Sequence, residues 1–196
     1  MKKKIVFIFA VICMILFIIF YYIFYISGNN IIRNQNEFVE DVFKKLENYE
    51  AEIKVNIISN KNENIYDMYQ IVKDNYSKLV INYPENIKGL EIEFESDCLK
   101  IKNEKTNMEK IYENYKNGIN NSLFLNTFIK EYKENVSEVL DTEEEIIVKV
   151  NLNNNTYIKS KELYLNKNTG LPIKLLIKDN TKKINTSIIY NDIKIK

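Results

Sequence analysis

The clearest pattern in the sequence is the strict alternation of apolar and polar residues from Tyr49 to Ile57. Apolar side chains occupy every second position, and charged or amide side chains occupy the positions between them. This period of two is typical of a strand with one buried face and one solvent-exposed face. Similar stretches between polar turns predict further strands at residues 65–73, 76–83, 90–95, 99–102, 146–152, 157–165, 171–177 and 185–195, with a short strand or turn at 136–140.

Two other segments have the spacing of helices. From Gln35 onward, the apolar residues of segment 31–46 recur every three or four positions, which predicts an amphipathic helix. Segment 123–132 repeats this pattern, and the Ser122 hydroxyl can cap that helix. Segment 103–117 is polar with spaced apolar residues, and we expect a loop or an irregular helix there.

Strands and helices do not alternate along the chain, so a parallel sheet is disfavoured. The order of the predicted elements instead favours one antiparallel sheet of about eight to ten strands. We predict an α+β fold in which a strongly curved antiparallel sheet is covered by one or two helices.

The head of the chain differs from the rest. Residues 5–26 form an uncharged, mostly apolar run of 22 residues, and a bilayer core of about 30 Å needs about 20 helical residues. Three lysines, residues 2–4, precede this run, so the positive-inside rule places the N-terminus in the cytoplasm. We predict a transmembrane anchor at 1–28 and an extracytoplasmic domain at 29–196, and hence a single-pass protein of the cell membrane.

Two alternatives stay open for this head. A cleaved signal peptide has an apolar stretch of about 7–15 residues that ends at a small-x-small site, whereas this run is longer and residues 25–28 offer no good site. A lipoprotein signal would carry its lipid on Cys13, but Ile12 stands where a small residue is needed. The sequence therefore favours an uncleaved anchor.

The charges of the chain are balanced. Lysine and arginine total 28 residues and aspartate and glutamate total 27, which gives a formal net charge of +1. Such a chain lacks the basic surface that nucleic-acid binding requires. We expect no nucleic-acid partner.

The residues of common catalytic and metal sites are also missing. The chain has no histidine, which excludes Ser-His-Asp and Cys-His catalysis and histidine-based zinc sites. Its two cysteines, Cys13 and Cys98, cannot pair within one molecule because Cys13 lies in the apolar run. Glu91, Glu93 and Glu95 alternate with apolar residues, which is typical of a solvent-exposed strand face. We expect no enzymatic activity, no cofactor and no metal.

Four features of the chain are shared with one known group of proteins: a strand opening, a proline that closes an early strand, a hairpin and the terminal strand. They are Tyr49 with Ala51, Pro84, residues 163–172 and residues 190–195. The most specific piece is Thr-Gly-Leu-Pro at 169–172, where Gly170 supplies a positive φ. On these residues, segment 31–196 resembles the LolA/LolB/RseB-like group, and within it the clostridial germination lipoprotein (GerS-like) family.

The resemblance implies an incomplete, LolA-like barrel of antiparallel strands closed by helices. It also implies a non-catalytic, membrane-anchored extracytoplasmic binding or regulatory protein of sporulation or spore germination. Such a protein would hold or activate a protein partner, such as a cortex-modifying peptidoglycan amidase. The alternative is a carrier-like protein that binds a hydrophobic ligand, a lipid or a lipoprotein acyl chain. The chain departs from the GerS-like pattern at Ile12, where a lipobox has a small residue.

A candidate binding region follows from one proline. Pro172 cannot donate a hydrogen bond to a strand ladder, so it belongs at a strand start or on a sheet edge. A free edge can accept a strand from a partner or from a second copy of the chain. We therefore predict a partner-binding edge at Pro172, Lys174 and Lys178, which strand pairing between two copies could also use to form a homodimer.

Overall fold

The computed structural model describes residues 14–22, 35–59, 61–115, 122–152, 157–181 and 183–196. The chain divides into two compact units, Met1–Glu40 and Asp41–Lys196. The domain boundary predicted after residue 28 stays a prediction.

The second unit contains one sheet of eleven strands. Their bounds are β1 Tyr49–Ile58, β2 Glu63–Lys73, β3 Tyr76–Tyr83, β4 Leu90–Glu95, β5 Cys98–Asn103, β6 Met108–Tyr112, β7 Ser137–Asp141, β8 Glu145–Asn151, β9 Ile158–Asn166, β10 Pro172–Asp179 and β11 Ile184–Ile195. The helical elements of the described residues include a helix at 14–22, a second at 35–45, α2 at Leu125–Glu134, and the short 3-10 turns η1 Glu85–Ile87 and η2 Glu104–Thr106; residues 122–123, just before α2, are also in 3-10 conformation.

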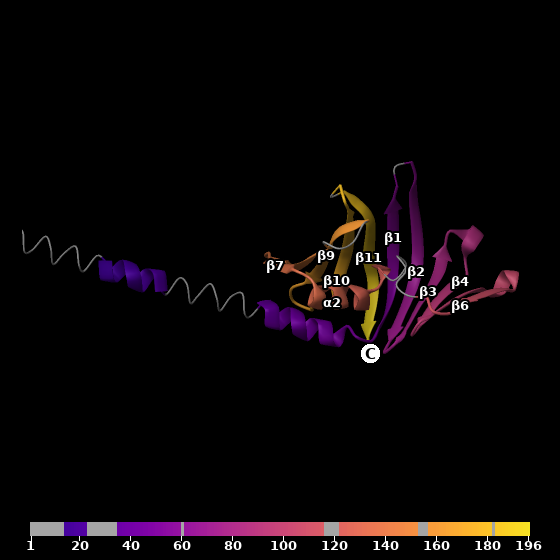
Figure 1. Cartoon of the computed structure of the whole chain (residues 1–196), viewed down its shortest axis with the longest axis horizontal. Coiled ribbons are helices and arrows are strands. Elements are labelled where there is room, and N and C mark those ends of the chain that lie inside the picture. Colours follow the sequence, from indigo (N-terminus) through magenta and orange to yellow (C-terminus); the bar gives the residue numbers. More distant parts are fainter. Residues whose placement is uncertain (1–13, 23–34, 60, 116–121, 153–156, 182) are drawn as a thin grey trace, which may run out of the picture. The chain divides into compact units, whose positions relative to one another are not determined.

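The strands follow the order β6-β5-β4-β3-β2-β1-β11-β10-β9-β8-β7, and every neighbouring pair is antiparallel. The first six strands therefore run outward from β1 in one direction, and the last five return to it from the other side (Figure 1). β6 and β7 end the sheet and do not pair with each other. The prediction of a curved antiparallel sheet that forms an incomplete barrel is confirmed.

The alternation seen in the sequence separates two faces of this sheet. On β1, the side chains of Tyr49, Ala51, Ile53 and Val55 are buried, and the strand register continues this face across the sheet. We call it the inner face, and the opposite side the outer face. On β8, β9 and β10 the inner face includes Val148, Leu163 and Leu175, each fully buried, so the core lies on this side.

α2 packs on the inner face through its buried side chains Leu125, Phe128 and Ile129. The Phe43 ring, from the helix at 35–45, stands edge-on to Phe128 with a centroid distance of 6.1 Å. The N-cap of α2 is Phe124, whose side chain makes no capping hydrogen bond. The predicted helix at 123–132 is thus confirmed, but Ser122 is not its N-cap.

One local expectation was wrong, and one strand departs from regular alternation. Residues Met108–Tyr112 form strand β6 inside the segment where we expected a loop or an irregular helix. On β10, the register shifts between Pro172 and Lys174, which marks a bulge. Pro172 is therefore buried together with Leu175 and Ile177, whereas unbroken alternation would have placed Ile173 on that face.

The predicted localisation as a single-pass membrane protein is corrected by the structure. Among the described residues, none of the helices has both the length and the apolar character needed to cross a bilayer. Residues 1–13 and 23–28 of the predicted anchor lie outside the described residues.

Candidate functional site

The predicted binding edge is not an edge. β10 lies inside the sheet, hydrogen-bonded to β9 on one side and to β11 on the other. Pro172 is the first residue of the strand, so the alternative position allowed for a proline, the strand start, is the one observed. Partner binding by Pro172, Lys174 and Lys178 stays a prediction.

Both lysines of this region have partners within the sheet. The Lys178 ammonium donates to Glu162 Oε1 at 2.6 Å. The Lys174 ammonium lies over the Tyr164 ring, 4.1 Å from its centroid. These contacts run across the outer face between β10 and β9, so replacing the lysines would also disturb the fold.

The edges of the described sheet are β6 and β7. An edge strand carries backbone N–H and C=O groups that point away from the sheet, and another strand can pair with them. The two edges differ in charge and in exposed apolar surface, which makes one of them the better candidate for binding a partner.

β7 is an acidic edge whose carboxylates already have partners. Lys149 lies 3.9 Å from Glu138, and the Lys167 ammonium bonds to both Asp141 and the Thr142 carbonyl. Inward-pointing and paired charges are a common protection of sheet edges. β7 is therefore the less favourable edge for a partner.

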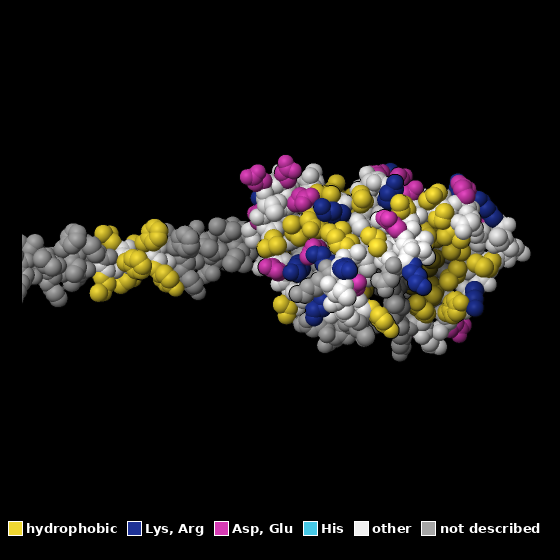
Figure 2. Space-filling model, turned by 90° about the horizontal axis from the view of Figure 1, so that it is seen from above, with side chains coloured by type: hydrophobic (Ala, Val, Ile, Leu, Met, Phe, Trp, Pro, Cys, Tyr) yellow, Lys and Arg dark blue, Asp and Glu magenta, His cyan; other side chains and the backbone are white. Residues whose placement is uncertain are grey.

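β6 is exposed along its whole length. All five of its residues are exposed, and three of them are large and apolar: Met108 at 45%, Ile111 at 51% and Tyr112 at 37% exposure. Figure 2 shows hydrophobic side chains gathered at the side of the domain that strands β3–β6 form. An exposed strand edge next to apolar side chains is the feature of this domain best suited to protein contact.

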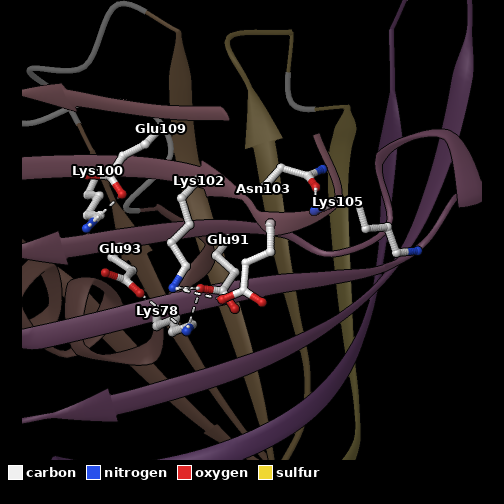
Figure 3. A network of polar contacts seen from close by, with 9 residues as sticks. Lys78, Glu91, Glu93, Lys100, Lys102, Asn103, Lys105 and Glu109 are labelled. Atoms are coloured by element: carbon white, nitrogen blue, oxygen red, sulfur yellow. Dashed lines mark hydrogen bonds and ion pairs between the residues drawn. The ribbon is translucent and has the colours of Figure 1, made fainter. Parts of the chain in front are cut away.

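The outer face behind β6 carries a network of charged side chains (Figure 3). Lys78 on β3 contacts Glu91 at 2.8 Å and Glu93 at 3.3 Å, both on β4. Lys102 on β5 contacts the same Glu91 carboxylate at 3.1 Å, and the network reaches β6 where Lys100 lies 3.3 Å from Glu109. Of the three glutamates predicted as a solvent-exposed strand face, Glu91 and Glu93 are thus part of an ion network that ties β3, β4 and β5 together.

The network shifts the pKa values of Glu91, Lys78 and Lys102 in the direction of ionisation. Burial disfavours the charged form of Glu91, but the hydrogen bonds from Lys78 and Lys102 outweigh it and lower the pKa of the carboxyl. Burial likewise disfavours charged Lys78, and its contacts with Glu91 and Glu93 outweigh this and raise its pKa. Each charge therefore stabilises its neighbours, and the arrangement supports the sheet and offers no poised acid or base.

The inner face holds two buried polar contacts that attach α2 to the sheet. The Tyr49 hydroxyl donates to Gln70 Oε1 at 3.0 Å and accepts from the Leu125 amide at 3.1 Å. The fully buried Lys161 ammonium lies 2.7 Å from Glu131 of α2. Burial lowers the pKa of Lys161, and the Glu131 charge opposes this.

Metal-binding and nucleophilic groups are sparse in the described part of the chain. Its described residues contain no group of three or more histidine, cysteine or acidic side chains placed to hold a metal. Cys98 at the start of β5 is a half-exposed free thiol. Its neighbours on β4 and β5 supply no histidine, since the chain has none.

The comparison with protein families decides where the chain belongs. Its sequence matches the family model described as sporulation protein YdcC-like over residues 2–196. The chain belongs to the YdcC-like sporulation protein family. No curated protein matches the sequence significantly.

Solved structures share the fold of this YdcC-like protein. One is a chain of the complex between the CwlD amidase of Clostridioides difficile and the GerS lipoprotein, with 23% identity and a TM-score of 0.54 over 86% of this chain and 95% of that one. A second is an uncharacterized conserved protein of Thermus thermophilus, with 12% identity and a TM-score of 0.52 over 82% and 86%. A third is the LolA superfamily protein NE2245 of Nitrosomonas europaea, with 11% identity and a TM-score of 0.47 over 83% and 93%. The resemblance proposed from the sequence is confirmed.

Sequence reasoning missed β6, the most exposed strand of this YdcC-like protein. A signal was available, because Met108, Lys110 and Tyr112 occupy alternate positions. The lysine between two apolar residues hid the alternation, since a pattern search expects a buried face to be apolar throughout.

Proposed function

We propose that this chain is a non-catalytic binding protein of sporulation that holds a protein partner, such as a peptidoglycan amidase. The proposal rests on one combination of findings. The sequence matches the YdcC-like sporulation family, and the fold is similar to that of a chain in the solved complex between the GerS lipoprotein and the CwlD amidase. The open sheet with its exposed strand β6 supplies a surface for such a partner.

The non-catalytic part of the proposal rests on the chemistry of the side chains. The charged groups of the outer face are paired with one another, and the pKa shifts of Lys78 and Glu91 favour the ionised forms. A general acid or base needs a pKa near the working pH. The pKa values of Lys78 and Glu91 are shifted away from that range.

The alternative, binding of a hydrophobic ligand, needs apolar space on the inner face. The inner side chains of β8, β9 and β10 are instead buried against the protein's own residues, and Val148, Leu163 and Leu175 have no exposed surface. This burial favours a protein partner over an acyl chain at this half of the sheet.

The test is a binding and activity experiment with the full chain. The chain, tagged at Lys196, is mixed with the amidases encoded in its own genome, and binding is measured by interferometry. We expect one amidase to bind, and the chain without amidase to leave peptidoglycan intact. Two outcomes would refute the proposal. One is hydrolysis of peptidoglycan by the chain itself; the other is that the chain binds none of the amidases and cross-links to no protein in sporulating cells.

A further inference from the structure

The β6 edge combines a free backbone with an unusual arrangement of charges. Four lysines lie in strands β3–β6, and three of them contact a carboxylate: Lys78, Lys100 and Lys102. The fourth, Lys110, makes no ion pair with any described residue, and its ammonium lies 4.9 Å from the centroid of the Tyr112 ring. One unpaired cation therefore stands at the middle of the exposed strand.

The register shows which face each β6 residue occupies. Tyr112, Lys110 and Met108 lie opposite Leu99, Ile101 and Asn103 of β5, which continue the inner face through Phe94 and Ile92 of β4. Glu109 and Ile111 lie on the outer face, opposite Lys102 and Lys100. A strand added to β6 would extend both faces by one row.

Lys110 restricts what can be added. A strand with an apolar residue opposite Lys110 would bury an unpaired ammonium, which is costly. A strand with a carboxylate there would complete an ion pair, because directly opposite side chains in an antiparallel pair lie close together. Lys110 therefore acts as a selective group that rejects most strands and admits an acidic one.

The outer face adds a second requirement. Residues that lie opposite one another on neighbouring strands alternate in charge there: Glu91 of β4 lies opposite Lys102 of β5, which lies opposite Glu109 of β6. The next position across the edge faces Glu109, and a basic side chain there continues the alternation. The positions opposite Met108 and Tyr112 continue the apolar inner face.

We propose that the β6 edge binds an antiparallel β-strand of a protein partner that carries an acidic residue opposite Lys110, a basic residue opposite Glu109 and apolar residues opposite Met108 and Tyr112. Read in its own direction, this strand has the pattern apolar, any, acidic, basic, apolar. The inference rests on the proposed function in one respect, that the occupant is a protein.

A second copy of the chain does not fit this pattern. Two β6 strands paired over their whole length would put Lys110 opposite Lys110. A shift by two residues in one direction would put Glu109 opposite Glu109, and a shift by two in the other direction would put Lys110 opposite Tyr112, which leaves its ammonium without a carboxylate. Like charges directly opposite each other destabilise a strand pair, so the edge favours a different chain over self-pairing.

The test uses two synthetic peptides of the same composition, Thr-Val-Val-Glu-Lys-Val-Thr and Thr-Val-Val-Lys-Glu-Val-Thr, each with a fluorescent label. Their affinity for the full chain is measured by fluorescence anisotropy at low salt. We expect the first peptide to bind at least ten-fold more tightly than the second. In the Glu109→Lys/Lys110→Glu double variant the preference should reverse, because both charges of the edge are exchanged.

Lys133→Glu serves as the control variant, since Lys133 is an exposed lysine of α2, away from the edge. It should retain the preference of the wild type. The double variant loses the ion pair of Glu109 with Lys100, but because all β6 residues are exposed this should lower the melting temperature by only a few degrees. If the double variant is less stable than this, Lys110→Gln replaces it in the test. The wild type should then prefer the first peptide, and Lys110→Gln should show no preference.

Equal affinity for both peptides, no binding of either, or an unreversed preference would overturn the inference. An amidase that binds the wild type and the double variant equally would also refute this edge, while the proposed function would stand. Selective peptide binding without any amidase binding would support the edge and refute the named partner. Dimerisation of the wild type that Lys110→Gln strengthens would overturn the inference in favour of self-pairing at this edge.

Discussion

At the scale of single residues, Val150 and Lys149 are neighbours on β8 with opposite environments. Val150 is fully buried on the inner face. Lys149 lies on the outer face, opposite Glu138 on one side and Glu162 on the other. Its positive charge therefore stands between two carboxylates of neighbouring strands.

These environments predict very different effects of substitution. Val150→Asp should lower the free energy of unfolding by at least about 3 kcal/mol, because it buries an unpaired charge. Lys149→Gln should cost less than about 1 kcal/mol, because a half-exposed ion pair contributes little. Urea unfolding followed by circular dichroism measures both. Equal losses would mean that the face assignment of β8 is wrong.

The buried Lys161–Glu131 pair predicts an asymmetry. Lys161 is fully buried, whereas the Glu131 side chain keeps 20% exposure. Glu131→Gln should therefore be the more harmful change, at about 3–5 kcal/mol, because it leaves a buried ammonium without its counter-charge. Lys161→Met should cost less, because the remaining carboxylate is close to water.

The pH dependence of Glu131→Gln distinguishes this explanation from a packing defect. Burial already lowers the pKa of Lys161, and loss of the Glu131 charge removes the opposing contribution. The unfolded chain then binds the proton more readily than the folded one, so stability should rise with pH up to the unfolded lysine value of about 10.4. The test measures the urea midpoints of the variant and the wild type at pH 7 and at pH 9.5. The midpoint of the variant should rise more between these two pH values than the midpoint of the wild type, and an equal or smaller rise would contradict the explanation.

At the scale of elements, α2 begins with a bond supplied by a distant strand. Its N-cap side chain makes no capping bond, and the Leu125 amide is bonded instead by the Tyr49 hydroxyl of β1. Burial raises the pKa of Tyr49 well above its usual value, and the Leu125 bond opposes this in part. The hydroxyl is therefore neutral over the whole working range and can donate to Gln70 at the same time.

Tyr49→Phe should release both groups. It leaves the Leu125 amide and the Gln70 carbonyl oxygen unsatisfied in the core, at a cost of about 1–3 kcal/mol. Hydrogen exchange should show faster exchange in the first turn of α2, ahead of the strands. Tyr69→Phe is the matched control: its hydroxyl donates to Glu50 on the outer face at 2.7 Å, so its loss should leave α2 unchanged. Equal protection of α2 in wild type and Tyr49→Phe would show that the bond does not hold the helix.

Most strands could be predicted from the sequence because each buries one face and exposes the other. The alternation from Tyr49 to Val55 and along β8 translates directly into buried and exposed side chains. β6 escaped prediction because both of its faces are exposed. The bulge after Pro172 escaped as well, since an extra residue in one strand depends on how its partner β9 is aligned.

The candidate site depended on information that periodicity does not contain. Local pattern identifies strands, but the order of strands follows from contacts between distant segments, such as β1 with β11. Pro172 was compatible with an edge and with a strand start, and only the sheet order shows that β10 is internal. The real edge β6 is identified by the same sheet order.

At the scale of the whole domain, the two halves of the sheet are held differently. The inner side chains of β8–β11 form a dry core with α2, including Val148, Leu163 and Ile188 without exposed surface. On β4 and β5, toward the β6 edge, Ile92 and Ile101 stay half-exposed, and the outer face contributes the ion network of Figure 3. Toward β6 this half therefore relies in part on its charge network, beside buried side chains such as Phe94 and Leu99.

This reliance gives the β3–β6 half a distinct pH dependence. The pKa of Glu91 is lower in the folded state, so the contribution of its carboxylate is complete above the unfolded value of about 4.3 and is lost as the pH falls through the folded value. The pKa values of Lys78 and Lys102 are raised, so their contribution is complete below about 10.4 and is lost as the pH rises through the folded values. The network stabilises the sheet between these limits.

Glu91→Gln should therefore lower the melting temperature at pH 7, and this effect should shrink as the pH falls below the unfolded value of about 4.3. Glu91 bonds to two lysines and its side chain is only 19% exposed, so we expect a loss of about 1 kcal/mol, which corresponds to about 2–4 °C for a chain of this size. As the pH falls through the lowered pKa of Glu91, the wild-type carboxyl takes up a proton, and it then resembles the neutral amide of the variant. Glu85→Gln is the control, because Glu85 forms a highly exposed pair with Lys88 and should change the melting temperature by about 1 °C or less. A deficit of Glu91→Gln that persists undiminished at pH 3 would show that the side chain stabilises β4 by packing, and that charge does not hold this half of the sheet.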